Sequence, residues 1–506
     1  MTLVASFPMT GGSALDPPET LVPPEVWTAV SNFRFSQQSH QGAATRVRGH
    51  AATFQTPAND VGPQFALNVD LLGAASRTAT NYLWYGGVEY ATGYSRIGQQ
   101  TGGVDSDVTP ASFTVANAAP GRWTGGILNN FVPVLNDQVH VPQYYDIAAV
   151  LWQNLPNYNP TGAGTGSWTA LRPYREFLVG MGLLISGGSY RSDTVYWSDA
   201  APYNGPPGTW IASATNQAGD AVVPGGGEII DGAVLGEDFI LYKKFASYRM
   251  RYVGGNYVMD VRPLFKGWGL HSQNCVAEHG GKHYVFTGDD LIVHDGQRWQ
   301  SMLYGKWRLQ LASSIGLASF VWLDALQREL WLCLSSGSAT CTTALVVDID
   351  NGHIGNREIP NLSGMIHESQ ESLAAPIGLY AGTTTASTGR FFDFASGNTF
   401  DGTNITASVA KTHVSLGKPE QVKIVKWVRP WLTAGSSQVI TVEVAGTMNA
   451  DDSPSYSSST FTAATDDKAD VFAQGRFLHF RFGSTTSQTA WGISGFDVGY
   501  ELRGAY

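Results

Sequence analysis

The sequence predicts an all-β protein: a β-propeller of about six blades followed by a C-terminal β-sandwich or barrel domain. Short apolar runs recur from Leu171 to Asp295, bounded by glycine or aspartate turns, and none is followed by an apolar pattern of helical length. The composition agrees, because 58 glycines accompany 15 Trp, 21 Tyr and 23 Phe. Turn-rich backbone with large flat side chains is typical of small sheets that pack on one another.

The predicted elements divide the 506 residues into three parts. Residues 1–31 contain a proline-rich, acidic stretch and are expected to form an extended N-terminal arm. Residues 32–400 are assigned to the propeller with its N-terminal strands, since a blade takes about 40 to 50 residues. Residues 401–506 follow a shift to Ser- and Thr-rich sequence and are expected to form the separate C-terminal β-domain.

Strands of the propeller are expected at intervals of roughly 8 to 12 residues, the spacing of repeated hairpins. They are Phe177–Ile185, Thr194–Trp197, Phe239–Lys243, Tyr248–Val253, His283–Thr287, Leu291–His294, Phe320–Leu323, Glu329–Leu334 and Ala344–Ile349. Those of the C-terminal domain are Val422–Trp427, Val439–Ala445, Phe477–Phe482 and Trp491–Tyr500. Asp146–Leu155 fits a helical period and predicts a short helix that Pro156 ends, and the polar stretch Asn449–Lys468 predicts a long loop.

The charge balance argues against tight binding of phosphate by the chain as a whole. There are 31 basic and 41 acidic side chains, a net charge of −10. Met1–Gly11 lacks a basic start and a continuous apolar core, and no segment approaches about 20 uninterrupted apolar residues. We therefore expect a protein made in the cytoplasm without insertion into a membrane.

Metal binding is not predicted. The three cysteines are odd in number and lack paired motif spacing, so we expect small buried side chains in strands (Cys275, Cys333 and Cys341). Three histidines fall in one predicted hairpin, where a core or surface position is favoured over a metal site (His279, His283 and His294). No cofactor is expected.

Carboxylates at two turns have a structural interpretation that is favoured over a catalytic or calcium-binding one. Asp289 and Asp290 are adjacent, so they are expected to form a turn instead of facing each other across a substrate. Asp348–Gly352 resembles a calcium loop but has glycine at its fifth position, which favours a hairpin turn. Because the sequence also lacks a phosphate-binding loop and a nucleophile elbow, we predict that the protein is not an enzyme.

One local excess of positive charge stands out: Lys243, Lys244, Arg249 and Arg251. On a strand pair such a cluster normally forms a solvated face. The alternative is a contact with an acidic neighbouring subunit or with passing DNA, which would be sensitive to salt.

A series of structural motifs occurs in a characteristic order. They are Pro23–Trp27, Asn32–Phe35, Gly49, Arg122–Gly126, Pro142–Asp146, Arg172–Tyr174, Glu176–Val179, Val195–Asp199, Trp210, Ala218–Gly219, Ile240–Lys243, Tyr252–Gly255, Asn274–Val276, Asp289–Gly296, Gly475–Phe477, Trp491 and Gly495–Asp497. In this order the chain resembles the tail nozzle proteins of short-tailed bacteriophages, the group that includes the packaged-DNA stabilisation proteins. The resemblance covers most of the chain and is strongest between Arg122 and Gly296.

The resemblance implies a virion tail protein, made in the host cytoplasm. In that family a β-propeller is joined to a β-domain, and six copies form a ring beneath the portal and adaptor rings that retains and channels the genome. The implied partners are further copies in a homohexamer, the adaptor protein, tail fibre or spike proteins, and transiently the DNA. The family has no catalytic residues to carry over, and the glycine-rich loop Asn216–Gly227 would line the lumen or touch fibres, or simply be flexible.

The alternative is a glycan-binding or glycan-cleaving propeller of a tail protein. In that case aromatic side chains such as Trp84, Tyr85 and Trp123 would stack on sugar rings, although core packing also explains them.

Overall fold

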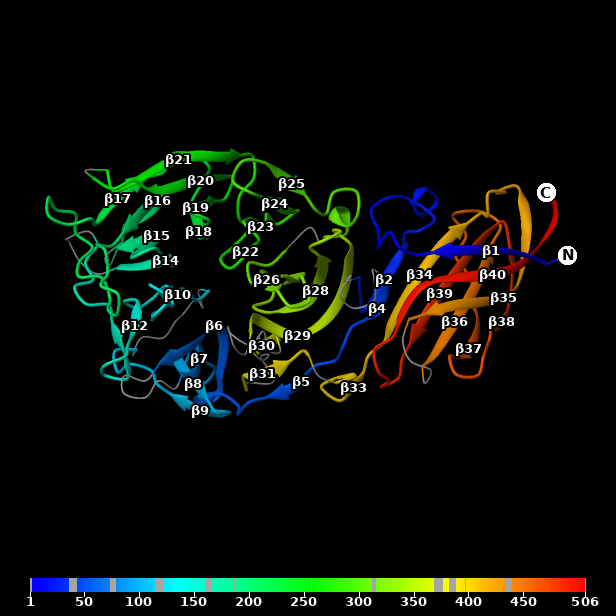
Figure 1. Cartoon of the computed structure of the whole chain (residues 1–506), viewed down its shortest axis with the longest axis horizontal. Coiled ribbons are helices and arrows are strands. Elements are labelled where there is room, and N and C mark those ends of the chain that lie inside the picture. The colour runs from blue at the N-terminus through cyan, green and yellow to red at the C-terminus, as the bar shows by residue number, and fades with distance from the viewer. Residues whose placement is uncertain are drawn as a thin grey trace.

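The computed structural model describes residues 2–35, 43–72, 79–113, 122–160, 166–185, 188–255, 257–311, 315–367, 376–381, 388–395, 397–433 and 438–505. A propeller forms one end of the molecule and a β-sandwich the other, with both chain termini at the far end of the sandwich (Figure 1). Helical structure in these residues is confined to three short 3₁₀ turns, η1 (Glu19–Leu21), η2 (Ala58–Asp60) and η3 (Arg308–Gln310). No helix of the described chain is long and apolar enough to span a membrane. The predicted all-β propeller class is confirmed.

Five blades of the propeller are four-stranded antiparallel sheets whose strands follow one another along the chain. They are β6–β9 (Val61–Leu72, Ala79–Glu89, Ser95–Thr101, Val104–Asp107), β10–β13 (Thr124–Leu128, Val132–Asn136, Gln143–Asp146, Leu151–Asn154), β14–β17 (Gly166–Tyr174, Phe177–Ile185, Tyr190–Trp197, Gly219–Val222), β18–β21 (Ile229–Leu235, Asp238–Lys243, Ala246–Tyr252, Met259–Lys266) and β22–β25 (Val276–His279, Lys282–Phe286, Leu291–His294, Trp299–Ser301). We number them blades 1 to 5. The first strand of each blade contacts the first strand of the next, so these strands surround the centre.

Blades 6 and 7 share a strand. Blade 6 contains β26 (Phe320–Asp324), β27 (Glu329–Leu334), β28 (Cys341–Asp348) and the first half of β29 (Ile354–His367), and blade 7 contains the second half of β29, β30 (Pro376–Tyr380), β31 (Arg390–Asp393) and β5 (Ala51–Thr53). Strands β29 and β30 contact β6, which closes the ring. The described residues therefore form seven blades and not about six, because one long strand serves two blades and the N-terminal part of the chain completes the last.

The C-terminal domain is a sandwich of two sheets. One contains β38 (Ala469–Gly475), β35 (Gln421–Leu432), β40 (Gly492–Ala505) and, beside β40, β1 (Leu3–Pro8) and β4 (Ala44–Arg46); the other contains β2 (Ala29–Ser31), β34 (Ala407–Val414), β39 (Phe477–Ser484), β36 (Val439–Thr447) and β37 (Ser457–Thr462). A small hairpin of β32 (Thr399–Phe400) and β33 (Thr403–Asn404) precedes it. The two sheets meet through the rings of Phe480 and Phe482, whose centroids lie 5.1 and 5.0 Å from that of Phe496.

The N-terminal segment belongs to both halves of the molecule. The sequence assigned residues 1–31 to an extended arm, but here they supply β1 and β2 to the sandwich. The buried ammonium of Lys411 donates hydrogen bonds to the carbonyl oxygens of Pro23 and Val26, at 2.6 and 2.9 Å, and so holds the proline-rich stretch against β34. The segment is therefore part of the folded core of the C-terminal domain.

The propeller and the sandwich are joined through a continuous apolar core. Strand β3 (Phe33–Arg34) pairs with β29 of the propeller, and the Phe33 ring lies edge-on to Trp491 of the sandwich at 5.1 Å. The Asn32 side chain donates to the Thr406 carbonyl of the sandwich and accepts the Glu358 N–H of the propeller. Strand pairing, hydrogen bonds and ring packing therefore connect the propeller to the sandwich at this junction.

Most strands predicted from the sequence are confirmed, but two segments differ. All nine propeller strands and all four C-terminal strands proposed above coincide with or overlap observed strands. Asp146–Leu155 is not a helix: Asp146 pairs with Leu151 in the β12–β13 hairpin, and its carboxylate accepts the N–H groups of Ala148 and Ala149. Part of the polar stretch Asn449–Lys468 is strand β37, which pairs with β36 at the edge of its sheet and leaves Ser457 and Ser458 exposed.

Indole rings occupy space that glycines leave free. A Cβ atom on Gly86 would lie 2.2 Å from the Trp123 ring, and one on Gly180 would lie 2.5 Å from the Trp168 ring. Both tryptophans are completely buried. Each glycine is therefore required by a close side-chain approach and not by its backbone angles.

We expect Gly180→Ala to destabilise the protein by about 1–3 kcal/mol, because the added methyl group overpacks a rigid site beside Trp168. Gly208→Ala is the matched control, since a Cβ there meets nothing within 4 Å. Urea unfolding followed by tryptophan fluorescence measures both. Equal midpoints for the two variants would contradict this account of the packing.

Candidate functional site

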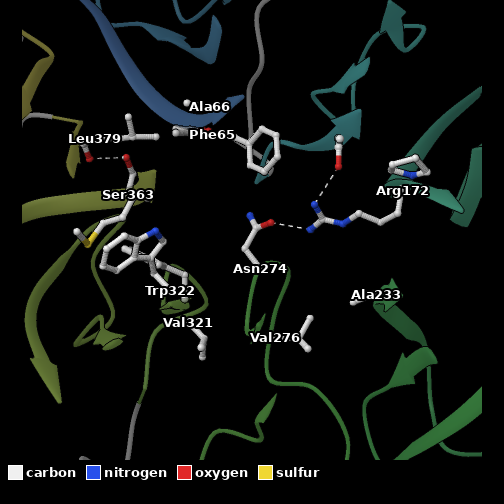
Figure 2. A pocket seen from close by; sticks show the side chains of 18 of the residues that line it. Phe65, Ala66, Arg172, Ala233, Asn274, Val276, Val321, Trp322, Ser363 and Leu379 are labelled. Carbon is white, nitrogen blue, oxygen red and sulfur yellow. Dashed lines mark hydrogen bonds between the residues drawn. The ribbon is translucent and has the colours of Figure 1, made fainter. Parts of the chain in front are cut away.

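The strongest candidate for a functional site is a cavity of about 310 Å³ at the centre of the propeller (Figure 2). The innermost strands of the blades supply its walls, including Phe65 of blade 1, Arg172 of blade 3 and Trp322 of blade 6. The cavity is therefore the central channel of the propeller, where such folds commonly place binding sites.

Arg172 crosses this channel and joins four blades. Its guanidinium forms a bidentate ion pair with Asp231 of blade 4, with N–O distances of 2.8 and 2.6 Å. It also donates to the Asn274 side chain before blade 5 at 2.6 Å and to the Gly125 carbonyl of blade 2 at 3.1 Å (Figure 2). Asp231 is completely buried and also accepts a hydrogen bond from the Asn274 N–H at 3.0 Å. The Arg172 guanidinium and this N–H together compensate its buried negative charge.

Arg122 also joins several blades through hydrogen bonds, at the end of the channel where the inner strands begin. It precedes β10 of blade 2, and its guanidinium donates to the carbonyl oxygens of Gln273, Ala318, Ser319 and Ser363. Three of these carbonyls belong to the segments that enter blades 5 and 6, and the Ser363 carbonyl belongs to β29, the first strand of blade 7. Burial lowers the pKa of Arg122 from its usual value, and the carbonyl oxygens compensate the buried charge.

The channel can offer apolar contact and a few hydrogen bonds to a ligand. None of the described residues that line the cavity of Figure 2 is Asp, Glu, His, Cys or Lys. The lining therefore supplies no pair of ionisable groups for acid–base chemistry. No group of three or more His, Cys, Asp or Glu side chains in the described chain is arranged to hold a metal ion.

We expect Arg172→Met to cost about 3–5 kcal/mol of stability, because it leaves the Asp231 carboxylate buried and unpaired. Arg175→Met is the matched control three residues away, since Arg175 pairs with the exposed Glu237 and should cost at most about 1 kcal/mol. The shift of the urea midpoint measures both. A small effect of Arg172→Met would show that the channel does not depend on this ion pair.

The structure separates the predicted cationic cluster of Lys243, Lys244, Arg249 and Arg251. Arg249 and Arg251 lie on β20 and both face Asp238 of β19, with nearest N–O distances of 4.0 and 2.5 Å. Lys244 is exposed in the turn, with its ammonium 5.6 Å from the centre of the Phe245 ring. Two of the four charges are thus paired within blade 4, and a contact with DNA or a subunit stays a prediction.

Lys243 is not on the surface at all. It is completely buried at the end of β19, and its ammonium donates to the Val223 carbonyl. Burial lowers the pKa of this lysine. The hydrogen bonds from Lys243 to the Val223 carbonyl and from Tyr248 to the Pro224 carbonyl connect the glycine-rich loop Asn216–Gly227 to blade 4.

The adjacent carboxylates lie in turns. Thr287 and Asp290 close the turn between β23 and β24 through a backbone hydrogen bond of 2.9 Å, and Arg308 pairs with the exposed Asp289 at 2.5 Å. Asp348 accepts the Asp350 N–H at the hairpin between β28 and β29. The turn interpretation of both segments is confirmed.

Two of the three predicted histidines form a buried network with a tyrosine that sequence reasoning missed. The Tyr242 hydroxyl lies 2.7 Å from His283 Nδ1 and 2.6 Å from His294 Nε2. His283 Nε2 lies 2.7 Å from the Val234 carbonyl, and the Gly296 N–H donates to His294 Nδ1. One assignment satisfies every contact, with both rings neutral: His283 donates to Val234 and His294 donates to Tyr242.

This network predicts loss of stability in acid. Burial lowers the pKa of His283 and lowers that of His294 to about 3, below their common unfolded value of 6.5. Between these values the unfolded chain binds more protons, so the free energy of unfolding falls as the pH falls from about 6.5 toward 3. His294→Gln should flatten this slope by up to about 1.4 kcal/mol per pH unit.

Urea midpoints measured between pH 4 and 7 test this prediction. His279→Gln is the matched control, because His279 is a partly exposed side chain of the same hairpin that lies outside the network. An unchanged slope in His294→Gln would mean that this histidine does not resist protonation in the folded protein.

The aromatic residues considered for sugar stacking are in the core. Trp84 and Trp123 are completely buried and Tyr85 is 1% exposed. Several other aromatic side chains are exposed, and one of them is Trp299, which is 51% exposed beside Trp268 at the edge between blades 4 and 5. All three cysteines are buried free thiols, as expected, and burial raises the pKa of Cys341 to about 12.

No protein-family model and no curated protein matches this sequence. Among solved structures, the chain is similar to AztD from Citrobacter koseri, with 10% identity, a TM-score of 0.35 and coverage of 88% of this chain and 100% of AztD. It is also similar to a candidate 6-phosphogluconolactonase from Bacteroides fragilis, with 10% identity, a TM-score of 0.38 and coverage of 62% of this chain and 87% of the other. Similarity at this level carries no functional argument.

Proposed function

We propose that this protein is a non-enzymatic component of the virion, the subunit of a hexameric tail nozzle in a short-tailed bacteriophage. Six copies would form a ring below the portal and adaptor, retain the packaged genome and channel the DNA during ejection. The observation that carries the proposal is the ordered series of motifs from Pro23 to Asp497, which spans both halves of the molecule.

The joining of the two halves supports a mechanical role. The N-terminal segment passes from the sandwich (β1 and β2) to blade 6 (β3), back to the sandwich (β4) and on to blade 7 (β5). Relative motion of the halves would break strand pairing at several of these crossings. A wall that must resist the pressure of packaged DNA requires such stiffness.

For the proposed conduit, the closed propeller channel favours a DNA path between subunits over one through the propeller. Arg122 and Arg172 bind across the centre, and the remaining space of about 310 Å³ cannot hold a duplex. A DNA conduit built from this chain therefore needs several copies around a common axis. The net charge of −10 favours weak contact with phosphate, which suits a conduit that must release DNA.

The alternative, a glycan-binding or glycan-cleaving propeller, has less support. The aromatic residues Trp84, Tyr85 and Trp123 are buried, and the described lining of the channel lacks a carboxylate pair. Under this alternative a sugar ring would stack on an exposed aromatic side chain, of which Trp299 is one. Binding of the purified protein on a glycan array, abolished by Trp299→Ala, would favour this alternative.

The decisive experiment examines virus particles assembled without this protein, by electron microscopy and by DNA content of the heads. We expect heads that package DNA and then lose it, on tails that end below the adaptor. Adding back the purified protein should restore six copies per tail and DNA retention. Full heads on complete tails, or three or twelve copies per tail, would overturn the proposal.

A further inference from the structure

A second cavity lies where blades 6 and 7 meet the N-terminal segment that crosses from the sandwich. Its volume is about 130 Å³, several times the space that one water requires. Three arginines from different parts of the fold line it: Arg34 of β3, Arg48 between β4 and β5, and Arg357 of β29. Such convergence of guanidinium groups is unusual in a chain with more acidic than basic residues.

Arg357 is the base of this cavity. It is 4% exposed, and its guanidinium carbon lies 4.4 Å from the centre of the Trp331 ring and 4.7 Å from that of Phe394. Because aromatic rings cover the guanidinium group, it can form hydrogen bonds only through its edge. Among the described residues this edge has one acceptor, the Arg48 carbonyl at 3.2 Å, and Nε has none.

The nearby carboxylates do not neutralise Arg357. Glu329 is buried and pairs with Arg34 at 3.0 Å, and the Asp324 carboxylate accepts the Gln327 N–H. No carboxylate of the described chain forms an ion pair with Arg357. Of the residues that line the cavity, three are arginines and one, Asp324, is a carboxylate, so the lining carries an excess of positive charge.

A buried guanidinium without a counter-charge is costly, so the cavity favours an anion. The flat edge of a guanidinium matches a planar carboxylate, which it can bind through two parallel hydrogen bonds. The Asp324 carboxylate lines the same wall and would repel a second negative charge. One charge and planar shape together favour a carboxylate over a phosphate dianion.

We propose that this cavity is a binding site for a single carboxylate group, gripped by Arg357 at its base and by Arg48 at its mouth. The carboxylate belongs either to a small free acid or to an Asp or Glu side chain of another protein. Arg48 is exposed and donates to the Ala395 carbonyl at 3.1 Å, so its side chain borders the opening without supporting the core.

Titration calorimetry of the full-length protein with sodium acetate at constant ionic strength tests the proposal. We expect saturable binding of one acetate per chain. Arg357→Met should weaken it at least tenfold, and Arg48→Gln about threefold or more. Arg328→Met is the matched control, because Arg328 pairs with Asp350 outside the cavity and its loss should leave binding unchanged.

Two further titrations identify which molecule carries the carboxylate and whether the site prefers a carboxylate to a phosphate. Blocked aspartate (N-acetylaspartate N-methylamide) that binds as well as acetate indicates a protein side chain as the occupant, and acetate binding alone indicates a small free acid. If Arg357→Met does not fold, Arg48→Gln carries the test by itself. No saturable acetate binding, equal affinity in the arginine variants, or tighter binding of inorganic phosphate would overturn the proposal.

Discussion

Closure of the blade ring is the constraint on which the rest of this structure depends. The innermost strands can bury their apolar side chains only if every blade contacts two neighbours, so the first and last blades must meet. Strand β5 completes blade 7, and β29 contacts β6. Arg122 and Arg172 then cross the centre and bind the blades that closure has brought together.

Buried cations act as internal cross-links throughout the molecule. Arg122 in the channel, Lys411 in the sandwich and Arg46 between the halves each donate to several backbone carbonyls from distant segments. A guanidinium or ammonium group has several donors and can therefore join more chain segments than a neutral side chain. This use of cations withdraws positive charge from the surface, which strengthens the acidic character of the exterior and weakens attraction to nucleic acid.

The junction between the propeller and the sandwich unites the two proposals. The crossings of the N-terminal segment pair its strands with both halves, and the same crossings bring Arg34 and Arg48 to the cavity above Arg357. A carboxylate bound there would neutralise Arg357, which has no ion pair among the described residues. The site would thus stabilise the connection on which a mechanical role depends.

The local pattern of apolar and turn residues was sufficient to predict most of the strands, the turns and the fold class. Alternation and turn residues identified β15, β24 and β27 with their observed bounds, since side-chain period and turn chemistry act between near neighbours in the chain. The same reasoning failed at Asp146–Leu155, where an Asp turn and strand pairing outweighed a helical apolar period. It also misplaced Lys243, because charge alone does not reveal that the Val223 carbonyl accepts a hydrogen bond from its buried ammonium group.

Local sequence patterns thus predict a chain of short antiparallel sheets with buried thiols and an excess of acidic side chains. The seventh blade, the strands that residues 1–31 add to the sandwich, and the two arginine sites became apparent from the folded chain alone. The physical reason is separation along the chain: β5 and β31, or Arg48 and Arg357, lie some three hundred residues apart, and no local period records such partners.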